Sequence, residues 1–399
     1  MLRLIAGTTL LVLAASTASA QNSGTEDTRT QFPALLANSY FSVNVGAIDY
    51  PFSEAQLQPG FRTASIVVPH VAARVALFGH EFTRYLSVQG TYMRPVRYVA
   101  YHDVNGDQST HHVWMHFGGV TMKVRAPVAN RVSVFGEGGL GITSRSGFES
   151  GPTPVVRDTH YAAPLAGGGV EYHLGPAWDL TAGVLYSPGR SRDAQPRTIF
   201  TSGGFRYTMR PLAQERVEAN RSSGAIFPVN VLQVELSTGY GYGVNRFVSR
   251  RLPVFWFGNV NVDRGVAAHY TRNVFHSRRL FALDVGTSVS GWRSQGERNR
   301  FYTLSIYPLL RFTFLRTSRA DLYAVYSLAG PTYISQVRID GRDTGNHFTF
   351  QDFTGAGVFV GQKRNVTLGV KINHYSNGNI FTENAGLKIP ITATAGITF

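Results

Sequence analysis

Apolar and polar residues alternate along most of this chain, with a period of two that recurs from one end to the other. Around residue 120, Val120, Met122 and Val124 alternate with Thr121, Lys123 and Arg125. The segments at 232–237 and 303–312 repeat the pattern with other residues. Successive side chains of a strand point to opposite faces, so each segment predicts a strand with one apolar and one polar face. Strands that turn one row to lipid and the other to a polar lumen build transmembrane β-barrels.

The composition excludes a helical membrane protein and favours the barrel. Beyond its N-terminal segment the chain has no run of 18 apolar residues, which a spanning helix needs. Hydrophobic residues make up 43% and charged residues 16%, which is too apolar for disorder and too lightly charged for a coiled coil. Aromatics at 12% and 42 glycines favour strands and turns. The mean hydropathy of −0.08 fits a chain in which only alternate residues need be apolar.

The first twenty residues predict export. Arg3 precedes an apolar stretch, and Ala18-Ser19-Ala20 before Gln21 forms a small-residue cleavage site. We therefore expect a Sec signal peptide that is cleaved after Ala20. The absence of Cys excludes a disulfide scaffold, a thiolate zinc site and a cysteine nucleophile.

The chain is strongly basic, with a formal net charge of +14, which loss of Arg3 lowers by one. Export separates the protein from nucleic acid, so nucleic acid is a poor explanation of this charge. An anionic lipid surface fits better.

The alternating segments fall into two groups. About eight lie at 38–210 and about eight more at 229–399, and between them residues 211–228 are polar and do not alternate. Eight strands are the smallest number that closes a barrel around side chains alone. We expect an all-β chain with two tandem transmembrane antiparallel barrels: signal 1–20, linker 21–37, barrel 38–210, linker 211–228 and barrel 229–399. The alternative is one barrel of about sixteen strands, in which 211–228 is a periplasmic turn or plug.

The last strand places every second residue from Leu387 to Phe399 on one face, including Ile389 and Ile391. A chain ending on an outward-facing Phe resembles the C-terminal signal of bacterial outer-membrane barrels. We therefore expect a Gram-negative outer membrane, and the outer-membrane assembly machinery as a partner that reads Phe399.

Common catalytic motifs are absent: the chain has no Gly-rich phosphate loop, no His-Glu-x-x-His and no G-x-S-x-G. His111, His112 and His116 could suggest a metal site, but no acidic ligand has a fitting spacing. We expect two of these histidines at a loop end and one in the lipid belt, with no metal and no organic cofactor.

The informative stretch lies near the C-terminus. Val366, Leu368, Val370 and Ile372 form a lipid-facing row, and the same parity carries His374 and Ser376. A polar side chain facing lipid is costly away from the interface, and it is a functional candidate by default. Residues two apart in a strand have Cα atoms about 6.6 Å apart, so the imidazole can reach the hydroxyl. The pair is a candidate nucleophile and base; the alternative is that both residues sit at the membrane rim.

This region resembles a known family. The matching residues are His374-Tyr375-Ser376-Asn377, then Asn384 and Gly386, and upstream His347, Phe348, Phe350, Asp352 and the segment 355–358. They resemble the lipid A 3-O-deacylases of the outer membrane (PagL-type esterases), which are eight-stranded barrels with this motif on the outer wall. The resemblance covers residues 229–399 and is strongest from His347 onward. The N-terminal half resembles small OmpA-like barrels in general.

The resemblance implies a serine esterase acting on lipid A in lipopolysaccharide. It makes Ser376 the nucleophile, His374 the base, and Asn384 and Asn377 candidates for the oxyanion site. The family completes its triad with a Glu where this chain has Lys388, which the alternation places on the luminal face. A positive charge cannot orient a protonated imidazole.

Two acids could replace the missing Glu. Glu383 follows the motif but falls in a loop. Asp352 is better placed: if the turn at 361–365 centres on Lys363, antiparallel pairing sets Asp352 opposite His374 on the lipid side.

Three functions follow from these observations. The first is an outer-membrane esterase that removes an ester-linked acyl chain from lipid A, with its phosphates held by arginines near the outer rim. The others are a catalytically inactive structural or adhesive barrel, and a porin of about sixteen strands. Candidate arginines are Arg246, Arg250, Arg251, Arg278, Arg279, Arg293, Arg298 and Arg300.

Overall fold

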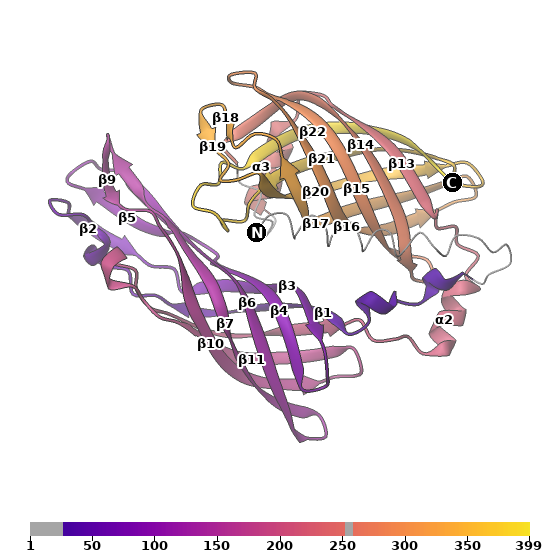
Figure 1. The fold of residues 1–399 in the computed structure, drawn as a ribbon, viewed down its shortest axis with the longest axis horizontal. Helices are drawn as coiled ribbons and strands as arrows, with labels where there is room; N and C mark the ends of the chain where they lie inside the picture. Colours follow the sequence, from indigo (N-terminus) through magenta and orange to yellow (C-terminus); the bar gives the residue numbers. More distant parts are fainter. Residues whose placement is uncertain (1–26, 252–257) are drawn as a thin grey trace.

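The computed structural model describes residues 27–251 and 258–399, and the side chains of 248–251 are not described. These residues form two closed antiparallel barrels of eight strands each, joined by a short helical linker (Figure 1). The predicted signal peptide and the cleavage site after Ala20 lie outside the described residues. Every helix within residues 27–251 and 258–399 is too short or too polar to span a bilayer.

The N-terminal barrel is built in the order β6-β4-β3-β1-β12-β11-β10-β7, and pairing of β6 with β7 closes it. Its strands are β1 (Ser39–Asp49), β3 (Val71–Glu81), β4 (Leu86–Pro95), β6 (Thr110–Ala129), β7 (Val132–Ser146), β10 (Thr159–His173), β11 (Trp178–Ser187) and β12 (Thr198–Thr208). Four short strands extend one end: β2 (Thr63–Val67), β5 (Val99–Val104), β8 (Phe148–Ser150) and β9 (Thr153–Val156). With the short helices η3 (Glu54–Gln56) and η4 (Ser191–Asp193), they form a cap around buried Tyr50, Tyr101 and Val155.

The C-terminal barrel follows chain order and closes by pairing of β13 with β22. Its strands are β13 (Asn230–Ser237), β14 (Val260–His276), β15 (Phe281–Ser294), β16 (Arg300–Arg316), β17 (Ala320–Ile334), β20 (Phe348–Val360), β21 (Val366–Ser376) and β22 (Leu387–Thr398). The hairpin of β18 (Arg338–Ile339) and β19 (Arg342–Asp343) and helix α3 (Tyr242–Arg251) lie in its long loops. Because β1 pairs with β12 and β13 with β22, the alternative of one sixteen-stranded barrel is wrong.

Each barrel has one end with short turns and one with long loops. The chain ends of the C-terminal barrel meet at the short-turn end, where the Asn230 amide donates to the Phe399 carbonyl at 3.0 Å. Outer-membrane barrels place short turns in the periplasm and long loops outside. We therefore call the long-loop end the outer end; in Figure 1 the outer ends of both barrels lie on the left.

The alternation seen in the sequence separates lipid-facing from luminal residues. On β6, Val120, Met122 and Val124 are each more than 50% exposed, whereas Thr121 and Lys123 between them are buried in the lumen. Leu232, Val234 and Leu236 of β13 point outward in the same way, with Glu235 inside. An apolar outside around a polar inside is the arrangement of a membrane barrel.

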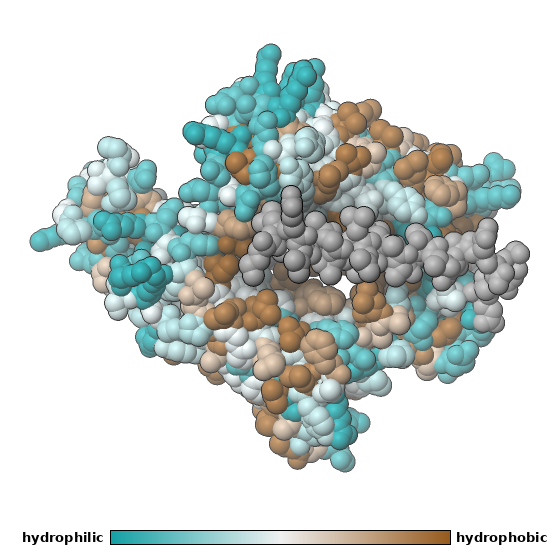
Figure 2. Space-filling model, in the orientation of Figure 1, coloured by the Kyte–Doolittle hydropathy of each residue, from teal (hydrophilic) through white to brown (hydrophobic). Residues whose placement is uncertain are grey.

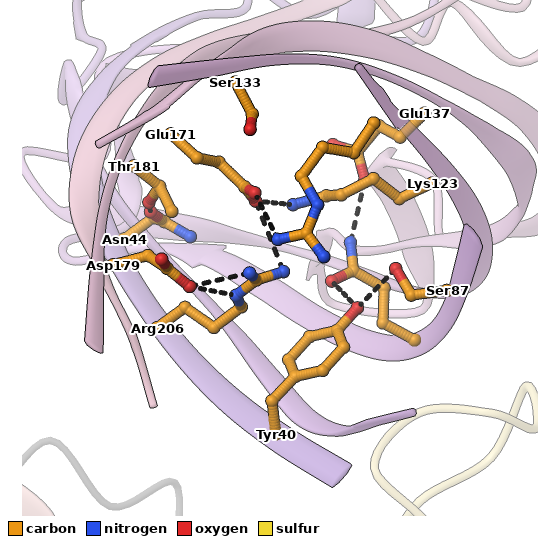
Figure 3. Close-up of polar contacts among 12 residues, drawn as sticks. Tyr40, Asn44, Ser87, Lys123, Ser133, Glu137, Glu171, Asp179, Thr181 and Arg206 are labelled. Carbon is orange, nitrogen blue, oxygen red and sulfur yellow. Dashed lines mark hydrogen bonds and ion pairs between the residues drawn. The ribbon is translucent and has the colours of Figure 1, made fainter. Parts of the chain in front are cut away.

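The lumen of the N-terminal barrel is filled by an ion-pair network centred on Arg206, which is 1% exposed (Figure 3). Its guanidinium donates twice to Asp179, at 2.6 and 2.9 Å, and lies 3.4 Å from Glu171. Glu171 also pairs with Lys123 at 3.1 Å. A cavity of about 30 Å³ beside this network has room for about one or two waters. Side chains, and not a channel, therefore occupy this lumen.

Removing Arg206 should destabilise the N-terminal barrel more than removing any exposed arginine. Arg206→Ala leaves the carboxylates of Glu81, Glu171 and Asp179 without this partner, and breaking a buried ion pair costs about 3–5 kcal/mol. Arg197→Ala is the control, because Arg197 and its partner Asp49 are both about half exposed and such pairs contribute about 0–1 kcal/mol. Urea unfolding in lipid bilayers measures both, and equal losses would contradict the role of the network.

The segment before β1 and the linker between the barrels are hydrogen-bonded to each other at the inner end. The residues before β1 form η1 (Thr28–Thr30) and η2 (Ala34–Leu36), and the predicted linker 211–228 contains helix α2 (Gln214–Arg221). Asn220 of α2 donates to the Thr30 carbonyl at 3.1 Å. Gln31 donates to the Leu212 carbonyl, also at 3.1 Å. The sequence did not indicate this helix, because its apolar residues are too few to form a stripe.

Residues 225–399 alone should refold in detergent as a heat-modifiable barrel, because every strand of the C-terminal barrel pairs within this range. Gel mobility before and after boiling measures this directly. Failure of this segment to fold while the whole chain folds would mean that the two barrels depend on each other.

Candidate active site

The outer end of β21 places His374 and Ser376 on the outward face. The residues between them point inward: Asn373 donates to luminal Glu235, and the Tyr375 hydroxyl accepts from Gln351 at 3.1 Å. The Oε2 oxygen of luminal Glu235 also lies 2.7 Å from Nε2 of His269, and this contact fixes this part of the barrel wall. His374 is only 1% exposed, whereas Ser376 is partly exposed and lines a groove outside the barrel. The imidazole is therefore more sheltered than a lipid-facing position predicts.

Asp352 lies directly across from His374. The β20–β21 register pairs Asp352 with His374 and Phe350 with Ser376, so a turn centred on Lys363 gives the observed pairing. One carboxylate oxygen, Oδ2, lies 3.8 Å from Nδ1 of His374. This distance is within the range of an ion pair but is longer than a hydrogen bond. Catalytic contacts are often long before substrate binds.

An irregularity in β17 fixes the other oxygen of this carboxylate. The β17–β20 register shifts between Ser327 and Gly330, and Ala329 within the shift has a φ of 47°. A left-handed φ is unusual for a residue with a Cβ. It turns the Ala329 N–H toward Asp352, where it donates to Oδ1 at 2.6 Å. Asp352 thus has one oxygen held by backbone and the other turned to the imidazole.

Lys388 lies on the outward face, which corrects the luminal position that simple alternation predicts. The β21–β22 register is Lys371 with Thr392 but Asn373 with Ile389, so β22 has one extra residue at Pro390. This bulge reverses the faces of the residues before it: Leu387 and Ile389 are buried in the barrel, and Lys388 pairs with His374. Strand prolines are typical of bulges. His374 therefore lies between Asp352 on one strand and Lys388 on the other.

The loop after β21 is held by three asparagines. Asn377 is fully buried, and its side-chain amide donates to the Thr344 and Glu383 carbonyls at 3.0 and 2.6 Å. Asn384 accepts from the Asn377 backbone N–H at 3.0 Å and donates to Asn379 at 2.9 Å. Asn384 also lines the groove beside Ser376. The amide of Asn377 is thus engaged within the loop, and Asn384 faces the groove.

Glu383 contributes its backbone carbonyl to this loop, and its side chain is exposed. Its carboxylate makes no ion pair with the residues that the structure describes. The structure therefore brings Asp352 to His374 and leaves Glu383 at the loop surface.

The candidate arginines divide between the two ends. Arg246, Arg293, Arg298 and Arg300 lie at the outer end of the C-terminal barrel, and Arg293 pairs with Asp263. Arg278 and Arg279 lie in the turn between β14 and β15 at the inner end, so their predicted place at the outer rim is wrong. The side chains of Arg250 and Arg251 lie outside the described residues. Within 27–251 and 258–399, no three His, Asp or Glu side chains form a metal site.

Residues 264–389 match the family model described as lipid A 3-O-deacylase (PagL). The C-terminal barrel matches the PagL family. The matched range contains Asp352, His374, Ser376, Glu383, Asn384 and Lys388.

Solved structures of outer-membrane barrels are also similar to this chain. The crystal structure of the outer membrane enzyme PagL has 16% identity and a TM-score of 0.30, covering 43% of this chain and 99% of that one. Neisserial surface protein A has 16% identity and a TM-score of 0.30, covering 43% and 97%. The attachment protein Ail of Yersinia pestis, with a heparin analogue, has 15% identity and a TM-score of 0.28, covering 43% and 99%. No curated protein sequence matches this chain.

Proposed function

We propose that this protein is an outer-membrane serine esterase that removes an ester-linked acyl chain from lipid A. The observation that carries the proposal is the outward-facing group of Ser376, His374 and Asp352 within the residues that match PagL. A hydroxyl, an imidazole and a carboxylate are the parts of a nucleophilic esterase. A place on the outer wall suits a substrate that stays in the membrane.

In the proposed reaction, Oγ of Ser376 attacks the ester carbonyl and its proton passes to Nε2 of His374. The tetrahedral intermediate collapses when the sugar oxygen leaves with that proton, and the acyl chain remains on Ser376. Water then attacks the acyl-serine with the same base, and the fatty acid is released. Asp352 beside Nδ1 would hold the ring and stabilise the imidazolium in both steps.

The oxyanion of each intermediate needs donors near Ser376. Asn384 is a candidate donor because it lines the groove beside Ser376. Its amide group has two hydrogens, and the hydrogen bond of one of them to Asn379 holds the amide in place. Backbone N–H groups of the same loop would supply further donors. Arginines at the outer end, such as Arg246 and Arg298, are candidates for the phosphates of lipopolysaccharide.

A specific observation favours a second candidate, an inactive structural or adhesive barrel. Lys388 lies across from His374, and a neighbouring positive charge disfavours the imidazolium that the reaction requires. Esterase activity therefore requires that the negative charge of Asp352 offset the positive charge of Lys388.

Mass spectrometry of lipid A, from cells with and without the protein, tests the proposal. We expect a species lighter by one ester-linked acyl chain when the protein is present. Identical lipid A profiles, with the barrel folded in the membrane, would favour the inactive barrel.

A further inference from the structure

A groove of about 2430 Å³ runs between the outer walls of the two barrels. Leu77, Val120 and Leu140 line it from the N-terminal barrel, and Val285 and Phe312 from the C-terminal barrel. Figure 2 shows apolar residues on both barrels beside this hollow. Along most of its length the lining is therefore apolar.

The outer end of the groove is polar. Asp352, Ser376 and Asn384 line it from one side, and Ser144 and His160 from the other. From its middle to its outer end the groove thus changes from apolar to polar, with the candidate nucleophile at the polar outer end. An ester-linked lipid changes in the same way, and its ester bond lies where tails meet headgroup.

The two barrels touch at this polar end. The Ser144 hydroxyl donates to the Asn379 carbonyl at 3.1 Å, and its oxygen lies 2.8 Å from Nδ1 of His160. His160 and Ser144 are direct partners in the register of β10 and β7. Asn379 in turn accepts from Asn384 at 2.9 Å. A side-chain pair of the N-terminal barrel therefore supports the loop that carries the candidate oxyanion donor.

We propose that the outer wall of the N-terminal barrel is the second half of the substrate site, and that the groove holds the acyl chains of an outer-leaflet glycolipid. This inference rests on the proposed esterase function. Lipid tails are as apolar as the walls, so the groove gains little free energy from burying them. The groove instead positions the substrate, because an acyl chain held between the two barrel walls places its ester bond at the polar end beside Ser376.

Photo-crosslinking in the full-length chain tests this inference without requiring catalysis. A benzoylphenylalanine replaces Leu140 or Val120 in the Ser376→Ala background, and the protein is placed in bilayers of lipopolysaccharide and phospholipid. The control replaces Val184, which is exposed to lipid on the same barrel and is not among the residues that line the groove. Heat-modifiability checks that each variant is folded.

We expect groove positions to capture lipopolysaccharide several-fold more than position 184, and added lipopolysaccharide to saturate that capture. Equal, unsaturable labelling at all three positions, or labelling by phospholipid alone, would overturn the inference. Fatty-acid release by protein with Ser376 intact is measured in parallel. If fatty acid is released but labelling is equal at all positions, the groove proposal is rejected and the esterase proposal stands. If labelling of the groove is saturable but no fatty acid is released, the groove proposal stands and the esterase proposal is rejected.

Discussion

Ser376→Ala should lower fatty-acid release from lipid A by about five to six orders of magnitude, as loss of a catalytic serine does in other serine hydrolases. The side chain is partly exposed at the end of β21, and among the described residues it makes no hydrogen bond that Ala would remove. Folding should therefore be unchanged. His374→Gln should have a similar effect on rate, with some loss of stability because the imidazole is buried.

Tyr375→Phe is the matched control for these variants. Tyr375 lies between the two candidate residues, but its hydroxyl is bonded to Gln351 and Thr303 in the lumen. Its loss should cost about 1 kcal/mol of stability and leave the rate nearly unchanged. Mass spectrometry of released fatty acid and heat-modifiability separate the two effects. Normal release by the Ser376 variant, or a larger loss of rate in the Tyr375 variant, would show that the reaction does not use this face.

Period-two alternation predicted most of the fold, and one short turn predicted one contact of the candidate site. Regular strands show this alternation because successive residues of a barrel strand face lipid and lumen in turn, as Val120 and Lys123 do. The register of Asp352 with His374 followed from one short turn, because a tight hairpin fixes the pairing of its two strands.

Alternation failed where the backbone is irregular. The bulge at Pro390 reverses the faces of Lys388 and Ile389, and the shift in β17 turns the Ala329 N–H to Asp352. Pro390 was a usable signal, since a proline in a central strand argues for a bulge. The Gly330-Pro331 pair directly after Ala329 was a comparable signal, since glycine and proline inside a strand also indicate irregular backbone.

Contacts between separate segments were also beyond the sequence. Ser144 and His160 are 16 residues apart, and only the β7–β10 register and the approach of the second barrel bring them to Asn379. The ends of strands were equally hard to assign to one side of the membrane. Arg278 and Arg279 follow a strand as Arg298 does, yet they lie at the opposite end.

The two charged neighbours of His374 make opposite predictions for the rate. Asp352→Asn keeps an oxygen to accept from the Ala329 N–H, so the fold should persist. It removes the charge that stabilises the imidazolium, which costs up to about 10⁴-fold in a triad. Glu383→Gln is the comparison, and it should lower the rate much less, because Glu383 lies in the loop at the groove edge whereas the strand register sets Asp352 across from His374. A larger effect of Glu383→Gln would transfer the role of the acid to Glu383.

Lys388→Glu should raise the rate, because it places a carboxylate on the outward face of β22 directly across from His374. The resembled family carries its acid at this position. A carboxylate there would stabilise the imidazolium as the acid of a triad does, so we expect a gain of about tenfold or more and recovery of the Asp352→Asn variant. Lys388→Gln separates removal of the positive charge from addition of the acid, and it should give a smaller gain. If Lys388→Glu creates release in a protein that otherwise has none, the natural chain is the inactive barrel and Lys388 is the reason; if it lowers an existing activity, Asp352 is the working acid and Lys388 serves the substrate.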